Sequence, residues 1–291
     1  SSVNIYKYEE WKDDPLFIED LIRMLDNVLD VFLDKADPVT MASAIASATN
    51  ERSIGLGAMG WHSFLQSKGV PFDSAVALGW TNKIWKQIYD QGISASEKLA
   101  TERGEPRALK GSGRRNAHCF AIAPNSTSSV ICGEISAGIE MNPANAIRRK
   151  TDVGNSIWKN PELLKIIPED DERWKSIIAS GGSVQHLDDV PQDVKDVFKT
   201  AYEVDQHWVI DQAAIRQQYI DQGQSINLYF PNPSSIKYVS SVCYSAWKKG
   251  LKSLYYHRTM APSRAENIGA KVEREVFQDY GEQQECLGCS G

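Results

Sequence analysis

Apolar strands and amphipathic helices alternate along this 291-residue chain, and the alternation limits the folds that it can adopt. The candidate strands at residues 117–124 and 225–230 are largely apolar and show no regular polar alternation. Such runs are typical of strands covered on both faces, as in parallel sheets flanked by helices. Helical periodicity at residues 15–34, 73–103 and 207–222 supplies the covering elements. The pattern predicts an α/β fold with largely parallel strands.

Composition and charge exclude some classes of protein. The net charge is −6, with acidic and basic residues interspersed, which favours neither a nucleic-acid partner nor an anionic membrane surface. The chain starts with neither a cationic segment nor the apolar run of a signal peptide, and no stretch approaches the length of a membrane span. An odd number of cysteines, five, favours a reducing compartment. We therefore expect a cytoplasmic protein.

Three glycines, Gly55, Gly57 and Gly60, have the spacing of a dinucleotide-binding loop. That motif requires a preceding strand and an acidic residue about 20 positions further on. Here the preceding residues read as a helix, and residues 61–69 read as another. We interpret the glycines as sites of close helix packing, with a nucleotide site as the alternative.

A turn rich in hydroxyl groups follows the predicted strand at residues 117–124. Its residues are Pro124, Asn125, Ser126, Thr127 and Ser128, and Ser129 comes next. Small hydroxyl residues after a strand can hold a phosphate with backbone N–H groups at a helix N-terminus. Ordinary N-capping is the alternative, because Ser and Thr are common caps. On this stretch alone, both interpretations stay open.

Two adjacent tyrosines, Tyr255 and Tyr256, lie in what reads as a short buried strand at residues 251–259. Neighbouring side chains on a strand point to opposite faces, so a regular strand would separate the two rings. Contact between the phenols would require an irregular backbone or a shared pocket. The plain interpretation is a strand with two aromatic residues, which β-propensity favours. The alternative is a radical relay, because a phenol can lose a proton and an electron together.

The cysteines offer two candidate sites. Cys132 precedes Glu134 by two positions, but it lies in an apolar run, where free cysteine is commonly inert. Cys286 and Cys289 form a CxxC pair in a polar stretch, residues 260–291, that we expect to be a flexible tail. Zinc needs four ligands, and this stretch holds no further Cys or His. We therefore favour a reversible dithiol over half a zinc site, and predict no metal site.

In combination, these signals resemble the C-terminal half of the large, catalytic subunit of class I ribonucleotide reductase. The matching segments are ERSIGLGAMG at 51–60, PNSTSS at 124–129, GIE at 138–140, LYYHRT at 254–259 and CLGC at 286–289. The resemblance spans nearly the whole chain. It implies the C-terminal part of a ten-stranded α/β barrel at residues 1–259, followed by a flexible redox tail at 260–291.

The resemblance also implies site residues and an activity, the reduction of ribonucleoside diphosphates to deoxyribonucleoside diphosphates. The turn from Pro124 to Ser128 would hold the substrate diphosphate. Tyr256 and Tyr255 would relay a radical from a small subunit, where a metal-radical cofactor is expected, so this chain needs none of its own. Cys286 and Cys289 would re-reduce the active-site disulfide and then react with a thioredoxin or glutaredoxin.

One part of the family pattern is missing from this sequence. The radical cysteine of the family lies in an Asn-x-Cys-x-Glu segment, and the nearest match here, Cys132-Gly-Glu134, has Val130 in place of the Asn. We therefore expect a naturally split subunit that is active only with an N-terminal fragment of the large subunit, the small subunit and a reductant. The alternative is a non-catalytic reductase remnant that acts as a binding or regulatory module. It is disfavoured because a remnant has no use for both tyrosines and the dithiol.

Overall fold

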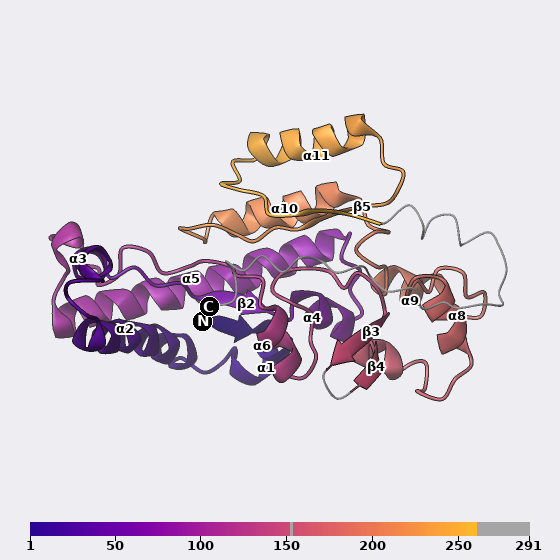
Figure 1. The fold of residues 1–291 in the computed structure, drawn as a ribbon, viewed down its shortest axis with the longest axis horizontal. Coiled ribbons are helices and arrows are strands. Elements are labelled where there is room, and N and C mark those ends of the chain that lie inside the picture. The colour runs from indigo at the N-terminus through magenta and orange to yellow at the C-terminus, as the bar shows by residue number, and fades with distance from the viewer. Residues whose placement is uncertain (152–153, 261–291) are drawn as a thin grey trace.

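The structure, a computed structural model, describes residues 1–151 and 154–260 (Figure 1). Its helices are α1 (Tyr8–Trp11), α2 (Phe17–Lys35), α3 (Ala42–Glu51), α4 (Trp61–Ser67), α5 (Ala75–Arg103), α6 (Ser126–Ile131), α7 (Pro161–Leu164), α8 (Arg173–Ala179), α9 (Gln192–Val197), α10 (Gln206–Gln217) and α11 (Ile236–Lys248). Its strands are β1 (Ser2–Asn4), β2 (Gly57–Met59), β3 (Ala146–Thr151), β4 (Gly154–Lys159), β5 (Leu228–Phe230) and β6 (His257–Thr259), and short 3₁₀ turns occupy Ile5–Lys7 and Arg107–Leu109.

The extended segments of the larger part of the fold form a wall of parallel neighbours. β1 pairs with β2, Leu56 bridges to Phe120, Ile122 bridges to Gln224, and β5 pairs with β6. Helices connect successive segments, and α10 packs against both α5 and α11 (Figure 1). This arrangement confirms the predicted α/β fold with parallel strands.

The parallel wall has shorter regular strands than the sequence predicts. Residues 117–124 read as one strand, but they make only single bridges at Phe120 and Ile122. The carboxylate of Asp221 accepts the backbone N–H groups of Cys119 (2.7 Å) and Phe120 (2.9 Å), so a side chain takes the place of a strand partner. Cys119, Phe120 and Ile122 are still buried, as predicted, and the N–H groups that a strand would pair are satisfied.

A smaller unit packs around the antiparallel hairpin of β3 and β4. Its apolar cluster includes Leu163, Trp174, Ile177 and Phe198. A charged stretch at residues 168–175 lies between α7 and α8 and includes the start of α8. Two of its charged residues, Arg173 and Asp171, form an ion pair (2.6 Å) that fixes the turn leading into α8.

The glycines at residues 55–60 serve close packing, as predicted, but of extended segments rather than helices. A Cβ on Gly57 would lie 2.4 Å from the backbone oxygen of Ala121. Gly60 has a φ of 81°, which residues with side chains rarely adopt. Gly57 therefore lets β2 approach the 118–122 segment, and Gly60 permits the turn between β2 and α4.

We expect Gly57→Ala to destabilise the fold by about 3 kcal/mol, because the new methyl group meets fixed backbone. Gly79 is the matched control: it lies within α5, and a Cβ there would meet nothing within 4 Å. Gly79→Ala should stabilise the fold by about 0.5 to 1 kcal/mol, because alanine favours the helix. Urea denaturation measures both, and equal effects would contradict the packing role.

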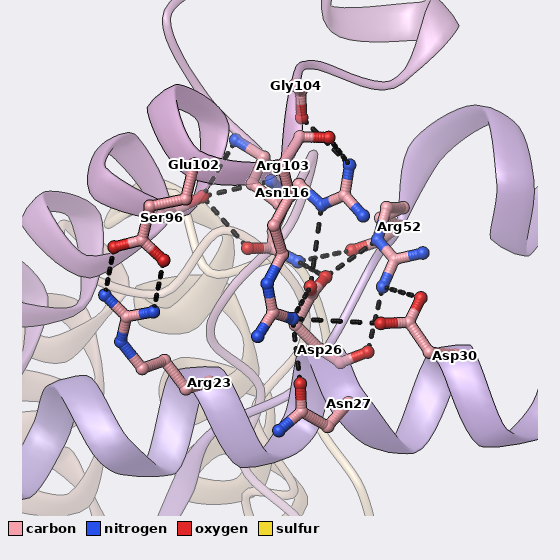
Figure 2. A network of polar contacts seen from close by, with 11 residues as sticks. Arg23, Asp26, Asn27, Asp30, Arg52, Ser96, Glu102, Arg103, Gly104 and Asn116 are labelled. Atoms are coloured by element: carbon pink, nitrogen blue, oxygen red, sulfur yellow. Dashed lines mark hydrogen bonds and ion pairs between the residues drawn. The ribbon is translucent and has the colours of Figure 1, made fainter.

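A buried ion network joins α2 to α5 and to the end of α3 (Figure 2). Asp26 of α2 is 0% exposed, and its carboxylate binds Arg52 (2.7 Å), Arg103 (2.9 Å) and Arg115 (3.5 Å). The side-chain amide of Asn116 also donates to it (3.3 Å). Burial alone would raise the pKa of Asp26, but Arg52 and its neighbours hold that pKa below its ordinary value. Removing one of these partners would leave a buried charge uncompensated, which strongly destabilises a fold.

No helix within residues 1–151 and 154–260 combines the length and the apolar character needed to cross a membrane.

Some predicted features fall outside the structure. The predicted tail, including Cys286 and Cys289, lies beyond the described residues except for Met260. The predicted boundary after residue 259 therefore stays a prediction.

Candidate functional site

The hydroxyl turn lies at the start of α6, against the parallel wall. Asn125 adopts a left-handed conformation, with φ 57° and ψ 32°. Its side-chain amide donates to the backbone oxygens of Ala58 (3.3 Å) and Ala123 (3.0 Å) and accepts from the Ser2 hydroxyl (3.0 Å). Asn125 therefore anchors the turn to β1 and β2.

The three residues after Asn125 present donors to solvent. The first helical hydrogen bond of α6 runs from the Ser129 N–H to the Asn125 oxygen (3.0 Å), so the N–H groups of Ser126, Thr127 and Ser128 precede the helical ladder. All three residues are exposed. Backbone and hydroxyl donors at one helix start suit an anionic oxygen.

A cavity of about 580 Å³ opens beside this turn. It is lined by Ser1, Ser2, Gly55, Met59, Ala121, Ile122, Ala123, Pro124, Asn125, Ser128 and Ser225. This volume lies within the usual range for small-molecule sites. The structure thus brings Pro124, Asn125 and Ser128 of the predicted turn to one cavity wall.

The two tyrosines lie at the entrance to β6 with their rings in contact. The ring centroids of Tyr255 and Tyr256 are 4.1 Å apart at 51°, and the phenol oxygens are 3.4 Å apart. The two residues are 40% and 44% exposed, so the predicted buried strand is wrong at this position. The guanidinium of Arg258 lies 5.3 Å from the Tyr256 ring centroid.

The backbone explains why both rings point the same way. The Tyr255 N–H donates to the Ile226 oxygen (2.8 Å), and the next N–H, of Tyr256, donates to the side-chain oxygen of Asn227 (3.0 Å). Successive N–H groups of a regular strand point to opposite sides, but here both point to one neighbour. The Asn227 side chain therefore accepts the second N–H group and stabilises the irregular backbone.

Asn227 is held in turn by Glu140. The Asn227 amide donates to one carboxylate oxygen of Glu140 (2.6 Å), and the Tyr229 hydroxyl donates to the other (2.8 Å). Burial raises the pKa of Glu140, although these two hydrogen bonds and the charge of Arg258 act in the opposite direction. Burial also raises the pKa of Tyr229, which keeps its hydroxyl a donor.

The segment that carries Asn227 borders two cavities. A second cavity, of about 10 Å³, is lined by Glu140, Asn227 and Tyr229 among others. Ser225 lines this cavity and also the larger one beside the turn. One extended segment, residues 223–230, therefore borders both features.

The cysteines of the described residues do not form a shared site. Cys119 is buried, which raises the pKa of its thiol to about 11. Cys132 is exposed at the end of α6, so the expectation that it is buried among apolar residues is wrong. Within residues 1–151 and 154–260, no cluster of three or more His, Cys, Asp or Glu side chains could hold a metal ion.

Sequence reasoning missed Asn227, Tyr229 and Arg258. Asn227 offered one signal, since a single amide within the otherwise apolar run of residues 226–230 is unusual for a buried strand. Its partner Glu140 lies 87 positions away along the chain, so no local pattern could join the two.

The parallel wall, its connecting helices and the polar turn that follows the 118–122 segment are those of an α/β barrel domain. A family model described as "Ribonucleotide reductase, barrel domain" matches residues 1–109 and 107–257. The chain therefore belongs to the ribonucleotide reductase barrel-domain family. This result confirms the predicted fold class and the resemblance.

Similar proteins are reductase large subunits. The chain is 41% identical over 297 residues to a "Putative ribonucleoside-diphosphate reductase large subunit" of Frog virus 3. The alignment covers 100% of the chain and 51% of that protein. It is 42% identical over 278 residues to the large subunit of Invertebrate iridescent virus 6, covering 93% of the chain and 29% of that protein. A solved class Id ribonucleotide reductase alpha subunit of Actinobacillus ureae matches with a TM-score of 0.83 and 39% identity, over 91% of the chain and 50% of that structure. The chain thus spans about half or less of the length of these relatives.

Proposed function

We propose that this chain is the part of a ribonucleotide reductase large subunit that binds the substrate diphosphate and relays the radical. The assembled enzyme would reduce ribonucleoside diphosphates to deoxyribonucleoside diphosphates. The observation that carries the proposal is the contact of the Tyr255 and Tyr256 rings, 4.1 Å apart, in a chain of this family. A regular strand would have separated them.

The turn from Pro124 to Ser128 would bind the diphosphate. Support comes from the donors of Ser126, Thr127 and Ser128 at the start of α6, and from the adjacent cavity of about 580 Å³. The N–H groups at a helix start carry partial positive charge, which offsets the charge of a phosphate. Asn125 holds the backbone of the turn in place.

The tyrosine pair would pass a radical by moving a proton and an electron at each step. The phenol oxygens are 3.4 Å apart, which is close to the distance of a hydrogen bond. One tyrosyl radical takes the hydrogen atom of its neighbour, so the radical moves while the number of phenol protons stays constant. Both tyrosines are partly exposed, as access from a radical-generating small subunit requires.

The remaining parts of the reaction would come from other polypeptide segments. The 291 residues contain no Asn-x-Cys-x-Glu sequence, so the radical cysteine would lie on a segment outside them. A small subunit would supply the metal-radical cofactor, and a thioredoxin or glutaredoxin in the cytoplasm would supply reducing equivalents. The chain itself would contribute the dithiol of Cys286 and Cys289.

Cys286→Ser with Cys289→Ser should abolish sustained turnover with a thioredoxin-type reductant while leaving the first turnover intact. The reason is that the first turnover uses the pre-reduced active site, and only later ones need the dithiol. Rapid-quench assays of deoxynucleotide per active site measure the two phases. Cys132→Ser is the matched control and should leave both unchanged, and sustained turnover by the double variant would contradict the role of the dithiol.

Binding of the substrate tests the proposed turn independently of turnover. The full chain in the assembled complex is titrated with cytidine diphosphate and with cytidine. Preference for the diphosphate, lost on replacing Ser128, which lines the cavity, by Ala, supports the proposal. Equal affinity for the two ligands would remove the phosphate role.

A further inference from the structure

We propose that Asn227 and Glu140 form a positioning pair that holds Tyr256, and with it Tyr255, in the geometry needed for radical transfer. The inference rests on the proposed function of the tyrosines and adds the residues that set their arrangement. It also connects the tyrosines to the hydroxyl turn, because the segment that carries Glu140 packs against that turn.

The Asn227 side chain supplies the acceptor for the Tyr256 N–H group. A regular strand would direct the Tyr256 N–H away from the 226–227 segment, and it would place the two rings on opposite faces. The Asn227 oxygen accepts this N–H at 3.0 Å, directly after the Ile226 oxygen accepts the N–H of Tyr255. Without that acceptor, the regular strand is the favoured alternative and the rings separate.

The Asn227 amide is held in one orientation. An amide can present either its oxygen or its nitrogen to a neighbour. Glu140 decides between them, because its carboxylate accepts from the Asn227 nitrogen at 2.6 Å. The oxygen then faces Tyr256. Tyr229 donates to the other carboxylate oxygen at 2.8 Å and keeps Glu140 in place.

The backbone that precedes Glu140 packs against the hydroxyl turn. Gly138 lies two residues before Glu140 and has a φ of 49°. A Cβ there would lie 3.0 Å from the Ala123 oxygen and 3.3 Å from the Pro124 oxygen, so this backbone packs directly on the turn. Glu140 therefore lies two residues from the backbone that packs on the turn.

The positive charge of Arg258 lies near the Asn227–Glu140 pair. Burial raises the pKa of Glu140, and the charge of Arg258, whose guanidinium lies over the Tyr256 ring at 5.3 Å, opposes that rise. Glu140 and Arg258 thus place opposite charges near the tyrosine backbone. Asn227 is buried and hydrogen-bonded to Glu140, while the tyrosines that the pair positions are exposed.

Two substitutions that exchange an amide and a carboxylate test the pair. Asn227→Asp keeps an acceptor for Tyr256 but sets two carboxylates against each other at the 2.6 Å contact. Adding Glu140→Gln restores the contact, because the new amide can donate to the new carboxylate and accept from Tyr229. We expect Asn227→Asp to lower turnover of the assembled complex on the order of 100-fold, and the double variant to recover to within about tenfold of the original.

A fluorine signal reports the geometry without requiring turnover. The full chain carries 3-fluorotyrosine at position 256, and ¹⁹F NMR follows its chemical shift. We expect Asn227→Asp to move the signal and the double variant to return it. Asn145→Asp is the matched control, a buried Asn that donates to the Gly182 (3.0 Å) and Phe198 (2.8 Å) oxygens, and it should leave the fluorine signal in place.

The outcomes separate this inference from the proposed function. An unchanged fluorine signal in Asn227→Asp, or the same change in Asn145→Asp, would overturn the positioning role. A signal that moves but does not return in the double variant would overturn the part of Glu140. If no assembly reduces cytidine diphosphate, the proposed function fails, while the fluorine result still decides whether the pair positions Tyr256.

Discussion

Replacing Tyr256 by Phe is expected to lower nucleotide reduction by the assembled complex at least about 1000-fold. Phenylalanine keeps the ring and its contact with Tyr255, but it lacks the hydroxyl group that loses a proton and an electron. Tyr255→Phe should have the same effect, because the two phenols act in series in the proposed relay. Steady-state formation of deoxycytidine diphosphate measures both variants.

Substrate binding is the control for this result. Neither tyrosine lines the cavity beside the hydroxyl turn, so affinity for cytidine diphosphate should stay unchanged. Tyr219→Phe is the matched variant, since its phenol donates to Asn82 (2.6 Å) away from the pair, and it should alter turnover by less than about twofold. Undiminished turnover in Tyr255→Phe or Tyr256→Phe would remove the relay.

The second large effect concerns stability. Asp26→Asn should destabilise the fold by about 3 kcal/mol, because Arg52 would lose its buried counter-charge. Asp30 of the same helix is the matched control: it also contacts Arg52 (2.8 Å), but its side chain is 50% exposed. Asp30→Asn should cost less than about 1 kcal/mol. Urea denaturation compares the two, and equal losses would contradict a buried network centred on Asp26.

The same network has a pH dependence of known sign. The pKa of Asp26 is lower in the folded state than in the unfolded state, so its contribution is complete at neutral pH. It is lost as the pH falls from about 4, the ordinary value of an aspartate, through the lower folded value. The stability difference between the original chain and Asp26→Asn should therefore shrink below about pH 4. A difference that stays constant to about pH 2 would contradict this assignment.

The parallel α/β fold could be predicted because it depends on local patterns. The apolar run at 118–122, the helical periodicity of α2 and α5, and the glycines that permit close approach are all visible in sequence. Strand lengths could not be predicted, because the Asp221 carboxylate supplies hydrogen bonds that a neighbouring strand would otherwise make. These bonds join residues 102 and 101 positions apart along the chain.

The position of the candidate site along the chain could be predicted from short runs of unusual residue types, while the roles of these residues stay predictions. The hydroxyl turn and the tyrosines are short, unusual runs, and the family resemblance gives each an expected role. The contact of the two rings was not predictable, because it depends on Asn227 and Glu140. The two residues lie 87 positions apart along the chain, and only the folded structure brings them together.

Reconstitution from separate polypeptides tests whether this chain is one part of a divided large subunit. The chain is mixed with a polypeptide that carries the Asn-x-Cys-x-Glu segment, a radical-generating small subunit and a dithiol reductant, and the conversion of cytidine diphosphate is measured. We predict deoxycytidine diphosphate only when the chain and both other polypeptides are present. Turnover by the chain alone, or an equal rate with the chain left out, would show that the large subunit is not divided in this way.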